Sequence, residues 1–326
     1  MPMPERYGAW LLLERLAVGG MAEVFLAVRD GELPGRLFTL KRLLPMLAQD
    51  EEQVTLFLDE ARLAAQLVHP ALPAVRELAR HGAGYHIAFD YVPGKDLRAV
   101  AERAHGLGGP LTPGLAAAVA RAVADALDHV HRARGAGGAP LHVVHRDVSP
   151  GNVLVGYDGV VRLIDFGIAQ ADLRRRPAGP GEPPALRGKF AYMSPEMVRG
   201  LPVDRRSDVF ALGVVLHELL TGERLFAGRS ELSTLERVRS ADVPPPSARR
   251  PGVPPGLDAV VLRALAREPE DRYAWAGELR DALTPFAAPD AEAKLAAFLA
   301  RAFADDLRRE RERLERARGS GRPTGA

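Results

Sequence analysis

Short runs of alternating apolar and polar residues fill the first part of the chain and predict β-strands. Three of these strands are expected at 11–16, 22–28 and 37–43, and two more near 74–80 and 84–91. Residues 50–68 change to helical spacing, with one apolar side made of Val54, Phe57, Leu58, Ala61 and Ala65. The pattern therefore predicts a small lobe of five strands and one helix.

Helical spacing prevails beyond Pro93-Gly94, where the chain is expected to bend. Predicted helices cover about 95–104, 115–134, 204–221, 231–239, 257–266 and 275–283. Asp158-Gly159 lies between two short apolar runs, near 152–156 and 160–164, and is typical of a hairpin turn. Residues 170–189 contain several prolines and glycines and predict a long loop, and 242–256 predict a proline-rich connection.

The last part of the chain, from about residue 290, is predicted to be helical and charged. Leu295, Leu299, Phe303 and Leu307 form one apolar stripe on that helix. We expect the stripe to dock on the larger lobe, with binding of a partner helix as the alternative. The mixed charges of 308–318 predict a solvated helix, and the final residues are expected to be disordered.

Composition excludes several classes of site. Apolar residues make up 47% of the 326 residues and charged residues 26%, which is typical of a globular protein, and the net charge of +2 gives no reason to expect nucleic-acid binding. The absence of cysteine excludes disulfides, thiolate nucleophiles and cysteine-ligated metal sites. The sequence shows neither a signal-peptide pattern nor an apolar run of membrane-spanning length, so we expect a cytoplasmic protein without a membrane span.

The strongest chemical signal is the run from His145 to Asn152 (H-R-D-V-S-P-G-N), followed by the triplet Asp165-Phe166-Gly167. Asp147 is suited to receive a proton from a hydroxyl substrate. Asn152 and Asp165 supply the oxygen ligands that Mg²⁺ prefers when it is held on a nucleotide triphosphate. Buried acids often only cap helices, but three such groups in this order favour the chemical interpretation.

With these motifs in place, residues 7–285 resemble the bacterial eukaryotic-like (Hanks-type) Ser/Thr protein kinases, and residues 144–155 are most similar to myxobacterial members. The resemblance implies an α+β, bilobal protein-kinase fold with an N-lobe at 1–92, a C-lobe at 93–285 and a charged helical tail at 286–326. It implies transfer of the γ-phosphoryl group of ATP, with Mg²⁺, to Ser/Thr hydroxyls of protein substrates in signalling. A regulatory partner is expected at the C-terminal helix.

The resemblance also implies the nucleotide-binding residues. The glycine-rich hairpin would contribute Leu16, Ala17, Gly19, Gly20, Ala22 and Val24. Only Gly19 matches one of the family's three glycine positions, because Ala17 and Ala22 replace the other two; on its own, such a hairpin is as often a simple turn.

A lone strand lysine such as Lys41 is usually solvated, but here Glu60 is expected to pair with it. The hinge backbone at Asp90 and Val92 would bind adenine, with Phe89 as gatekeeper and Val24 and Leu154 around the base.

Three further matches are structural in the family. Glu196 and Arg272 resemble its buried ion pair, and Asp208 resembles the helix acid that braces the catalytic loop. They support the fold rather than the chemistry.

Two positions depart from the family in a complementary way. Ser149 stands where Ser/Thr kinases carry a lysine, and Lys189 stands where they carry a threonine. Because the family places these two positions close together near the γ-phosphate, we hypothesise that a charge and a hydroxyl have exchanged places. The simpler alternative is a solvated Lys189 and the plain loss of a lysine at 149.

The expected activation segment carries no hydroxyl acceptor. No Ser, Thr or Tyr occurs from Ile168 to Ala191, although Arg146, which often binds a loop phosphate in the family, is present. We therefore expect activity without prior phosphorylation.

Two other functions stay open. A pseudokinase that scaffolds partners is favoured by Ala17, Ala22 and Ser149, but retention of Lys41, Glu60, Asp147, Asn152 and Asp165 argues against it. A kinase-like enzyme acting on a small molecule is the second alternative, which the Ser194-Pro195-Glu196 segment with Arg272 disfavours, because in the family that segment shapes a peptide platform.

Overall fold

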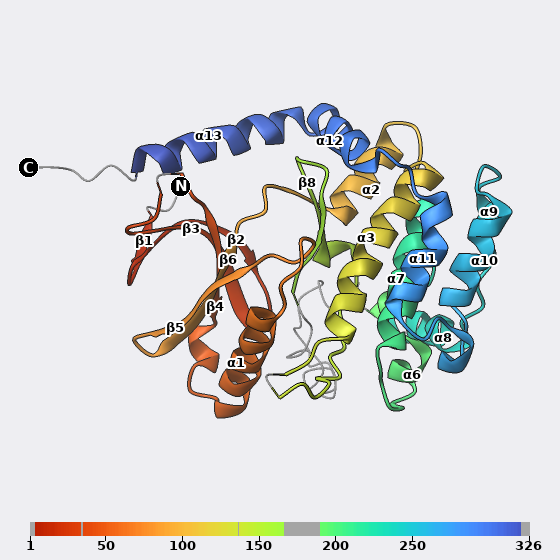
Figure 1. The fold of residues 1–326 in the computed structure, drawn as a ribbon, viewed down its shortest axis with the longest axis horizontal. Helices are drawn as coiled ribbons and strands as arrows, with labels where there is room; N and C mark the ends of the chain where they lie inside the picture. Colours follow the sequence, from red (N-terminus) through yellow and green to blue (C-terminus); the bar gives the residue numbers. More distant parts are fainter. Residues whose placement is uncertain (1–3, 34, 136, 166–189, 321–326) are drawn as a thin grey trace, which may run out of the picture. The chain divides into compact units, whose positions relative to one another are not determined.

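A computed structural model describes residues 4–33, 35–135, 137–165 and 190–320. The chain forms two compact units (Figure 1). Unit 1 consists of Met1–Pro93 with Phe303–Ala326, and unit 2 consists of Gly94–Ala302. The chain therefore passes between the units twice, once after Pro93 and once after Ala302.

Unit 1 contains a six-stranded antiparallel sheet in the order β1-β2-β3-β4-β6-β5. The strands are β1 (Glu5–Tyr7), β2 (Trp10–Val18), β3 (Ala22–Arg29), β4 (Phe38–Leu43), β5 (Val75–His81) and β6 (Gly84–Asp90). The expectation of five strands was wrong because β1, which pairs with β2 through Tyr7 and Trp10, is too short to show an alternating pattern.

One face of this sheet forms the apolar core of unit 1. Trp10 and Phe38 are each 1% exposed and meet edge to face, with ring centroids 5.2 Å apart. Phe25, Leu40 and Ala88 complete much of this cluster. The residues between them along the strands, such as Val24 and Lys41, belong to the opposite face.

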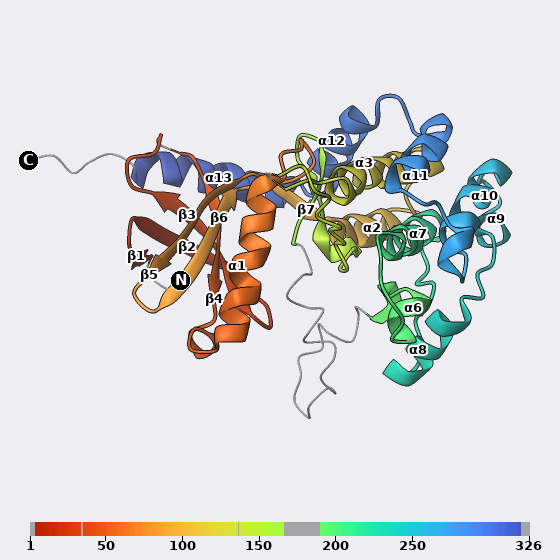
Figure 2. The same ribbon diagram turned by 60° about the horizontal axis from the view of Figure 1, so that its bottom comes forward.

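Helix α1 (Glu51–Gln66) begins where Asp50 caps it, because the Asp50 carboxylate accepts hydrogen bonds from the amides of Glu52 and Gln53. Phe57 and Ala61 are buried on its inner side, as the helical spacing predicts, but Ala65 of the predicted apolar side is exposed and Ala64 is buried instead. Figure 2 shows α1 and the C-terminal helix α13 (Ala304–Ser320) at different parts of the sheet.

Unit 2 is mainly helical. Its helices are α2 (Leu97–Gly106), α3 (Pro113–His131), α6 (Pro195–Val198), α7 (Arg206–Thr221), α8 (Glu231–Ser240), α9 (Pro246–Arg249), α10 (Pro255–Ala264), α11 (Ala276–Leu283) and α12 (Ala291–Ala302). Short 3₁₀ turns cover Pro150–Asn152, Phe190–Tyr192, Pro269–Asp271 and Thr284–Phe286, with one in unit 1 at Pro45–Leu47. Nearly every residue of α7 is buried, so this helix forms the centre of the unit. Across the described residues, no helix combines the length and apolar character needed to cross a membrane.

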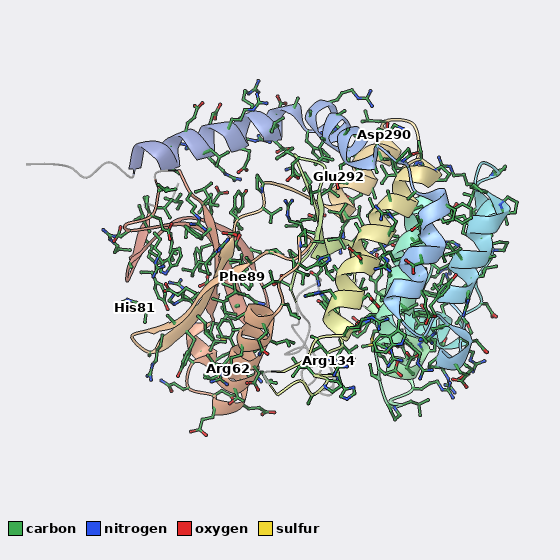
Figure 3. The ribbon with its side chains drawn as sticks, in the orientation of Figure 1. Arg62, His81, Phe89, Arg134, Asp290 and Glu292 are labelled. Carbon is green, nitrogen blue, oxygen red and sulfur yellow. The ribbon has the colours of Figure 1, made fainter. Side chains whose placement is uncertain are left out.

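A small sheet in unit 2 carries the predicted hairpin. Strand β8 (Val153–Gly156) pairs with β9 (Val161–Leu163), and β7 (Gly94–Asp96), which sequence reasoning missed, pairs with β8. Gly159 lies in the hairpin turn with φ +83°, and a Cβ added there would lie 1.9 Å from the carbonyl oxygen of Glu292 in α12. Glycine is therefore required both for the turn and for the close approach of α12 (Figure 3 labels Glu292).

The tail divides into two helices with different environments. Leu295 and Leu299 of α12 are 1% and 0% exposed in unit 2, which confirms the expected docking of this half of the stripe. The expectation of a fully solvated helix over 308–318 was wrong, because Glu310 and Ala317 of α13 are 5% and 3% exposed against unit 1. The predicted loop at 170–189 and the final residues 321–326 lie outside the described residues.

Candidate active site

The glycine-containing hairpin joins β2 and β3 in unit 1. Leu16 and Ala17 lie near the end of β2, and Ala22 and Val24 lie at the start of β3, with Ala17 paired to Val24. The amide of Gly19 donates to the carbonyl oxygen of Ala22 at 2.8 Å and closes the turn.

The fold itself does not require glycine at Gly19 or Gly20. Neither residue has a positive φ, and a Cβ on Gly19 would make only an ordinary 3.5 Å contact with the Ala22 carbonyl oxygen. Among the described residues, no non-neighbouring atom lies within 4 Å of a Cβ placed on Gly20. Glycine at these positions keeps side chains away from the hairpin backbone, which suits the approach of a phosphate group, although the amide of Gly19 itself is engaged by Ala22.

Lys41 and Glu60 form an ion pair in unit 1. The Lys41 ammonium on β4 donates to Glu60 Oε1 on α1 at 2.6 Å. Both side chains are largely buried, with 15% and 7% of their surfaces exposed. The pair therefore holds a cationic group beside Val24, the residue paired with Lys41 across β3 and β4.

The predicted hinge follows β6. Phe89 (labelled in Figure 3) ends the paired part of this strand together with Asp90, and the amide of Asp90 donates to the Ala74 carbonyl oxygen at 3.0 Å. The backbone of Asp90 could therefore offer an adenine base only its carbonyl oxygen. The Asp90 side chain accepts a hydrogen bond from Arg76 Nε at 2.9 Å. Burial raises the pKa of Asp90, but the hydrogen bonds and charges of Arg76 and Arg36 together outweigh burial and keep this pKa below its usual range.

The predicted catalytic loop of unit 2 is braced by Asp208 of α7, as the resemblance implies. The Asp208 carboxylate is 1% exposed and accepts hydrogen bonds at 2.8 Å from the amides of His145 and Arg146 and from the His131 ring. Burial raises the pKa of Asp208, but the His131 hydrogen bond and the neighbouring histidines outweigh it, so the pKa is held below its usual range.

This brace explains an unusual backbone conformation. Arg146 has φ +64°, a left-handed conformation that a side chain other than glycine rarely adopts. The two hydrogen bonds to Asp208 hold the amide of Arg146 and the amide of the residue before it, and the amide after it, that of Asp147, donates to His145 Nδ1. Sequence reasoning did not identify His131 as part of this network, because its contact to Asp208 spans 77 residues.

Asp147 and Asn152 contact each other directly. The Asn152 amide nitrogen donates to both the backbone carbonyl and the carboxylate Oδ2 of Asp147, each at 2.7 Å. The amide of Asp147 also donates to His145 Nδ1 at 3.3 Å. Because Asn152 donates through its side-chain nitrogen, its side-chain oxygen Oδ1 is the atom that could bind a cation.

The two predicted metal ligands are Asn152, at the end of the 3₁₀ turn Pro150–Asn152, and Asp165, two residues after β9. Asp165 has φ +55°, a second non-glycine residue in the left-handed region. The amide of Ile164 donates to the backbone carbonyl oxygen of Asn152 at 2.9 Å, so the two predicted ligands are carried by adjoining backbone segments of one unit. Two oxygen-bearing side chains fit Mg²⁺, which takes its other ligands from water and phosphate oxygens.

In the sequence, Ser149 precedes Asn152 and Leu154 follows it. Ser149 is 3% exposed and precedes the 3₁₀ turn, and Leu154 is half-buried in β8, opposite Asp96 of β7. Lys189 lies outside the described residues, so its distance from Ser149 is not defined.

The ion pair between Glu196 and Arg272 is present, which confirms the structural role expected from the resemblance. Two Arg272 nitrogens donate to the two Glu196 oxygens at 2.8 Å each, and both side chains are at most 4% exposed. Ser207 also donates to Glu196, a partner that the sequence did not reveal. Burial raises the pKa of Glu196, but the hydrogen bonds and charge of Arg272, together with the Ser207 hydrogen bond, outweigh burial and hold this pKa below its usual range.

Tyr192, the first hydroxyl after the acceptor-free segment, is tied into unit 2. Its hydroxyl donates to Glu218 Oε2 at 2.7 Å and also contacts Arg224. The residue is 5% exposed, and burial, with the Glu218 charge next, raises its pKa. No sequence pattern indicated this contact, which holds the segment before Ser194-Pro195-Glu196 in place.

Each unit thus gathers its own part of the predicted site. Unit 1 carries the glycine hairpin, the neighbouring Val24 and Lys41–Glu60 pair, and the predicted hinge at the end of β6. Unit 2 brings together Asp147, Asn152, Ser149 and the Asp208 brace.

Comparisons with known proteins agree with this arrangement. Residues 10–282 match the family model described as the protein kinase domain. The chain is 39% identical over 326 residues to tyrosine-protein kinase MasK of Myxococcus xanthus, a match that covers 96% of this chain and 49% of MasK. It is 41% identical over 271 residues to serine/threonine-protein kinase PknB of Mycobacterium tuberculosis, covering 82% of this chain and 41% of PknB.

Among solved structures, the PknI kinase domain of Mycobacterium tuberculosis is similar, with a TM-score of 0.63 and 30% identity. That match covers 88% of this chain and 99% of the PknI chain. The chain spans about half or less of the curated relatives MasK and PknB. The chain belongs to the protein kinase family, as a kinase of the bacterial Hanks type.

Proposed function

We propose that the chain transfers the γ-phosphoryl group of ATP, with Mg²⁺, to serine and threonine hydroxyls of proteins. The observation that carries this proposal is the direct contact between Asp147 and Asn152, on a loop that buried Asp208 holds in a strained conformation. A protein without catalytic duty has no physical reason to keep that strain. The contact therefore argues against the pseudokinase alternative.

In this proposal Asp147 accepts or orients the proton of the acceptor hydroxyl. Lys41, held by Glu60, contacts the α- and β-phosphates, and the hairpin backbone at Gly20, next to the turn that Gly19 closes, approaches the phosphate oxygens. Bound magnesium, held by Asn152 and Asp165, would neutralise charge on the transferring phosphate. Leu16, Ala17, Ala22, Val24 and Leu154 would surround the base and ribose, and the backbone of Asp90 and Val92 would bind adenine.

Tyrosine is the second candidate acceptor, for two reasons. MasK, a relative that matches nearly the whole chain, is named a tyrosine-protein kinase. Ser149 also replaces the lysine that Ser/Thr kinases carry near the transferring phosphate. PknB, which is named a serine/threonine-protein kinase, favours the first candidate.

The exchange between Ser149 and Lys189 belongs to the same proposal. Lys189 would supply the positive charge that the lysine at 149 supplies in relatives, and Ser149 would supply the hydroxyl contact. Activity without loop phosphorylation also remains a prediction, as do a cytoplasmic location and a regulatory partner at the C-terminal helix.

The proposal is tested with γ-labelled ATP, Mg²⁺ and myelin basic protein, comparing the wild type with Asp147→Asn. We expect the variant to lose about a hundredfold or more of the transfer rate, because the proton acceptor is removed while the side-chain shape is kept. Acid hydrolysis of the labelled product then separates phosphoserine and phosphothreonine from phosphotyrosine. Equal labelling by both proteins would refute the role of Asp147, and transfer only to small alcohols would favour the small-molecule alternative.

A further inference from the structure

The hinge residue Tyr91 contacts the opposite end of the chain. Its hydroxyl donates to Glu310 Oε2 in α13 at 3.0 Å. Glu310 is 5% exposed, so a carboxylate is buried directly beside the predicted adenine-binding backbone. Burial, followed by the charge and hydrogen bond of Glu310, raises the pKa of Tyr91, and the hydroxyl therefore remains a donor.

Glu310 is one link in a chain of polar contacts. Arg313, one turn further along α13, donates from Nη1 to Glu310 Oε2 at 3.1 Å and from Nη2 to Glu14 Oε1 at 2.7 Å. This chain joins the hinge, α13 and strand β2. A buried carboxylate is costly unless it is paired, so the docked position of α13 depends on these partners.

An apolar cluster lies beside the polar contacts. Ala317 of α13 is 3% exposed and packs against Leu26 and Leu37, which are 1% and 6% exposed; Leu314 and Tyr91 pack against the same cluster. The small alanine allows α13 to approach the sheet closely. Leu37 also accepts a hydrogen bond from the amide of Tyr91 at 3.3 Å. Helix α13 therefore holds Tyr91 directly through its side chain and indirectly through the backbone of Leu37.

The strand register shows which face of the sheet α13 covers. Val24 pairs with Lys41, and Leu26 pairs with Thr39, so these four side chains belong to one face. Helix α1 meets this face through the contact between Glu60 and Lys41, and α13 meets it through Leu26. The nucleotide face of unit 1 is thus bounded by α1 at one side and by the C-terminal helix at the other (Figure 1).

We propose that α13 is a positioning element for nucleotide binding, in which Glu310 and Ala317 fix Tyr91 and thereby set the backbone of Asp90 and Val92. This inference rests on the proposed binding of ATP. Neither residue is expected to touch the nucleotide. Both act through the hinge, so their replacement should change the affinity for ATP rather than the affinity for the protein acceptor.

The test uses the full chain and two variants that loosen α13 in different ways. Tyr91→Phe removes only the hydrogen bond to Glu310. Ala317→Arg places a long charged side chain where 3% of the alanine is exposed. Glu315→Arg, on the exposed side of the same helix, is the matched control. Thermal unfolding of each protein establishes that it is folded before binding is measured.

We measure the Kd for Mg-ATP by calorimetry, the KM for ATP and for myelin basic protein, and hydrogen exchange of the amides in 84–93. Tyr91→Phe and Ala317→Arg should raise the Kd and KM for ATP roughly five- to tenfold, with the KM for myelin basic protein within about twofold of wild type. The amides of 84–93 should exchange faster in both variants. Glu315→Arg should match the wild type throughout.

Three outcomes would contradict the inference. Unchanged exchange in 84–93 in folded variants would mean that α13 does not hold the hinge. Faster exchange with an unchanged Kd for Mg-ATP would reduce α13 to a stabilising helix. A wild type that binds no Mg-ATP would overturn the proposed function and the nucleotide role of α13 with it, and the exchange data would still distinguish this result from an undocked helix.

Discussion

The predicted hinge of unit 1 and the segment from His145 to Asn152 in unit 2 are held by different physical means. In unit 2, charged groups are buried and fully engaged: Asp208 accepts three hydrogen bonds, and Arg272 contacts both oxygens of Glu196. In unit 1, the hinge acid Asp90 contacts Arg76 with 34% and 45% of the two side chains exposed. We expect the buried network to hold its loop rigidly, and the half-exposed pair to leave the predicted hinge dependent on packing by α13.

The largest expected effect of this difference is on stability. Arg272→Met would leave the Glu196 charge buried without its partner, which costs about 3–5 kcal/mol of folding free energy. Arg76→Met in unit 1 removes an ion pair that is partly in water, and it should cost less than about 1 kcal/mol. Urea unfolding of the two variants, followed by tryptophan fluorescence and circular dichroism, measures both values.

The double variant Glu196→Gln/Arg272→Met serves as a control. It removes the orphaned charge, so it should recover part of the loss caused by Arg272→Met. Equal destabilisation by Arg272→Met and Arg76→Met would show that the two units do not differ in this respect.

The next effect concerns catalysis. Asp208→Asn keeps the shape of the Asp208 side chain but removes its charge and replaces one acceptor oxygen with an NH₂ donor. The amides of His145 and Arg146, which bond to different Asp208 oxygens, can then no longer both find an acceptor. We expect kcat to fall roughly a hundredfold through misplacement of Asp147, while the KM for ATP stays close to that of the wild type. This is the opposite pattern from Tyr91→Phe, and steady-state kinetics of the two variants side by side separates them. A change in the KM for ATP alone would contradict the assignment of Asp208 to the catalytic loop.

The contrast between the units also explains what the sequence could predict. The candidate residues of unit 2 lie within the short run His145–Asn152 and at Asp165, so their types and order alone indicate chemistry. The strands and helices around them have periodic patterns, and the long helices were predicted within a few residues. Strands β1 and β7 were missed because three residues carry no measurable period.

The support around the hinge was not predictable from the sequence. Glu310 and Tyr91 are 219 positions apart, and the charged sequence of α13 is typical of a solvated helix. Only the docked helix shows that Ala317 packs on Leu26 and Leu37. Local motifs identify the candidate catalytic residues, whereas the residues that support them are found through contacts that local patterns do not encode.

The smallest expected effect is a difference in acid sensitivity between two buried histidines. Burial lowers the pKa of His145 in unit 2 and of His86 in unit 1, and nearby carboxylates offset part of this for both: Asp208, Asp147 and Asp165 for His145, and Glu77, 3.2 Å away, for His86. His145 is the more completely buried of the two, at 0% exposed against 3%. A histidine whose pKa is lowered in the folded state contributes fully above its unfolded pKa of about 6.5, and that contribution is lost as the pH falls below it. The wild type should lose folding free energy between pH 7 and pH 5.5. His145→Asn should reduce this loss more than His86→Asn does, with a difference of up to about 1.4 kcal/mol per pH unit. Urea unfolding at both pH values measures the two slopes, and a steeper slope for His145→Asn than for the wild type would show that His145 does not limit the acid stability of the catalytic loop.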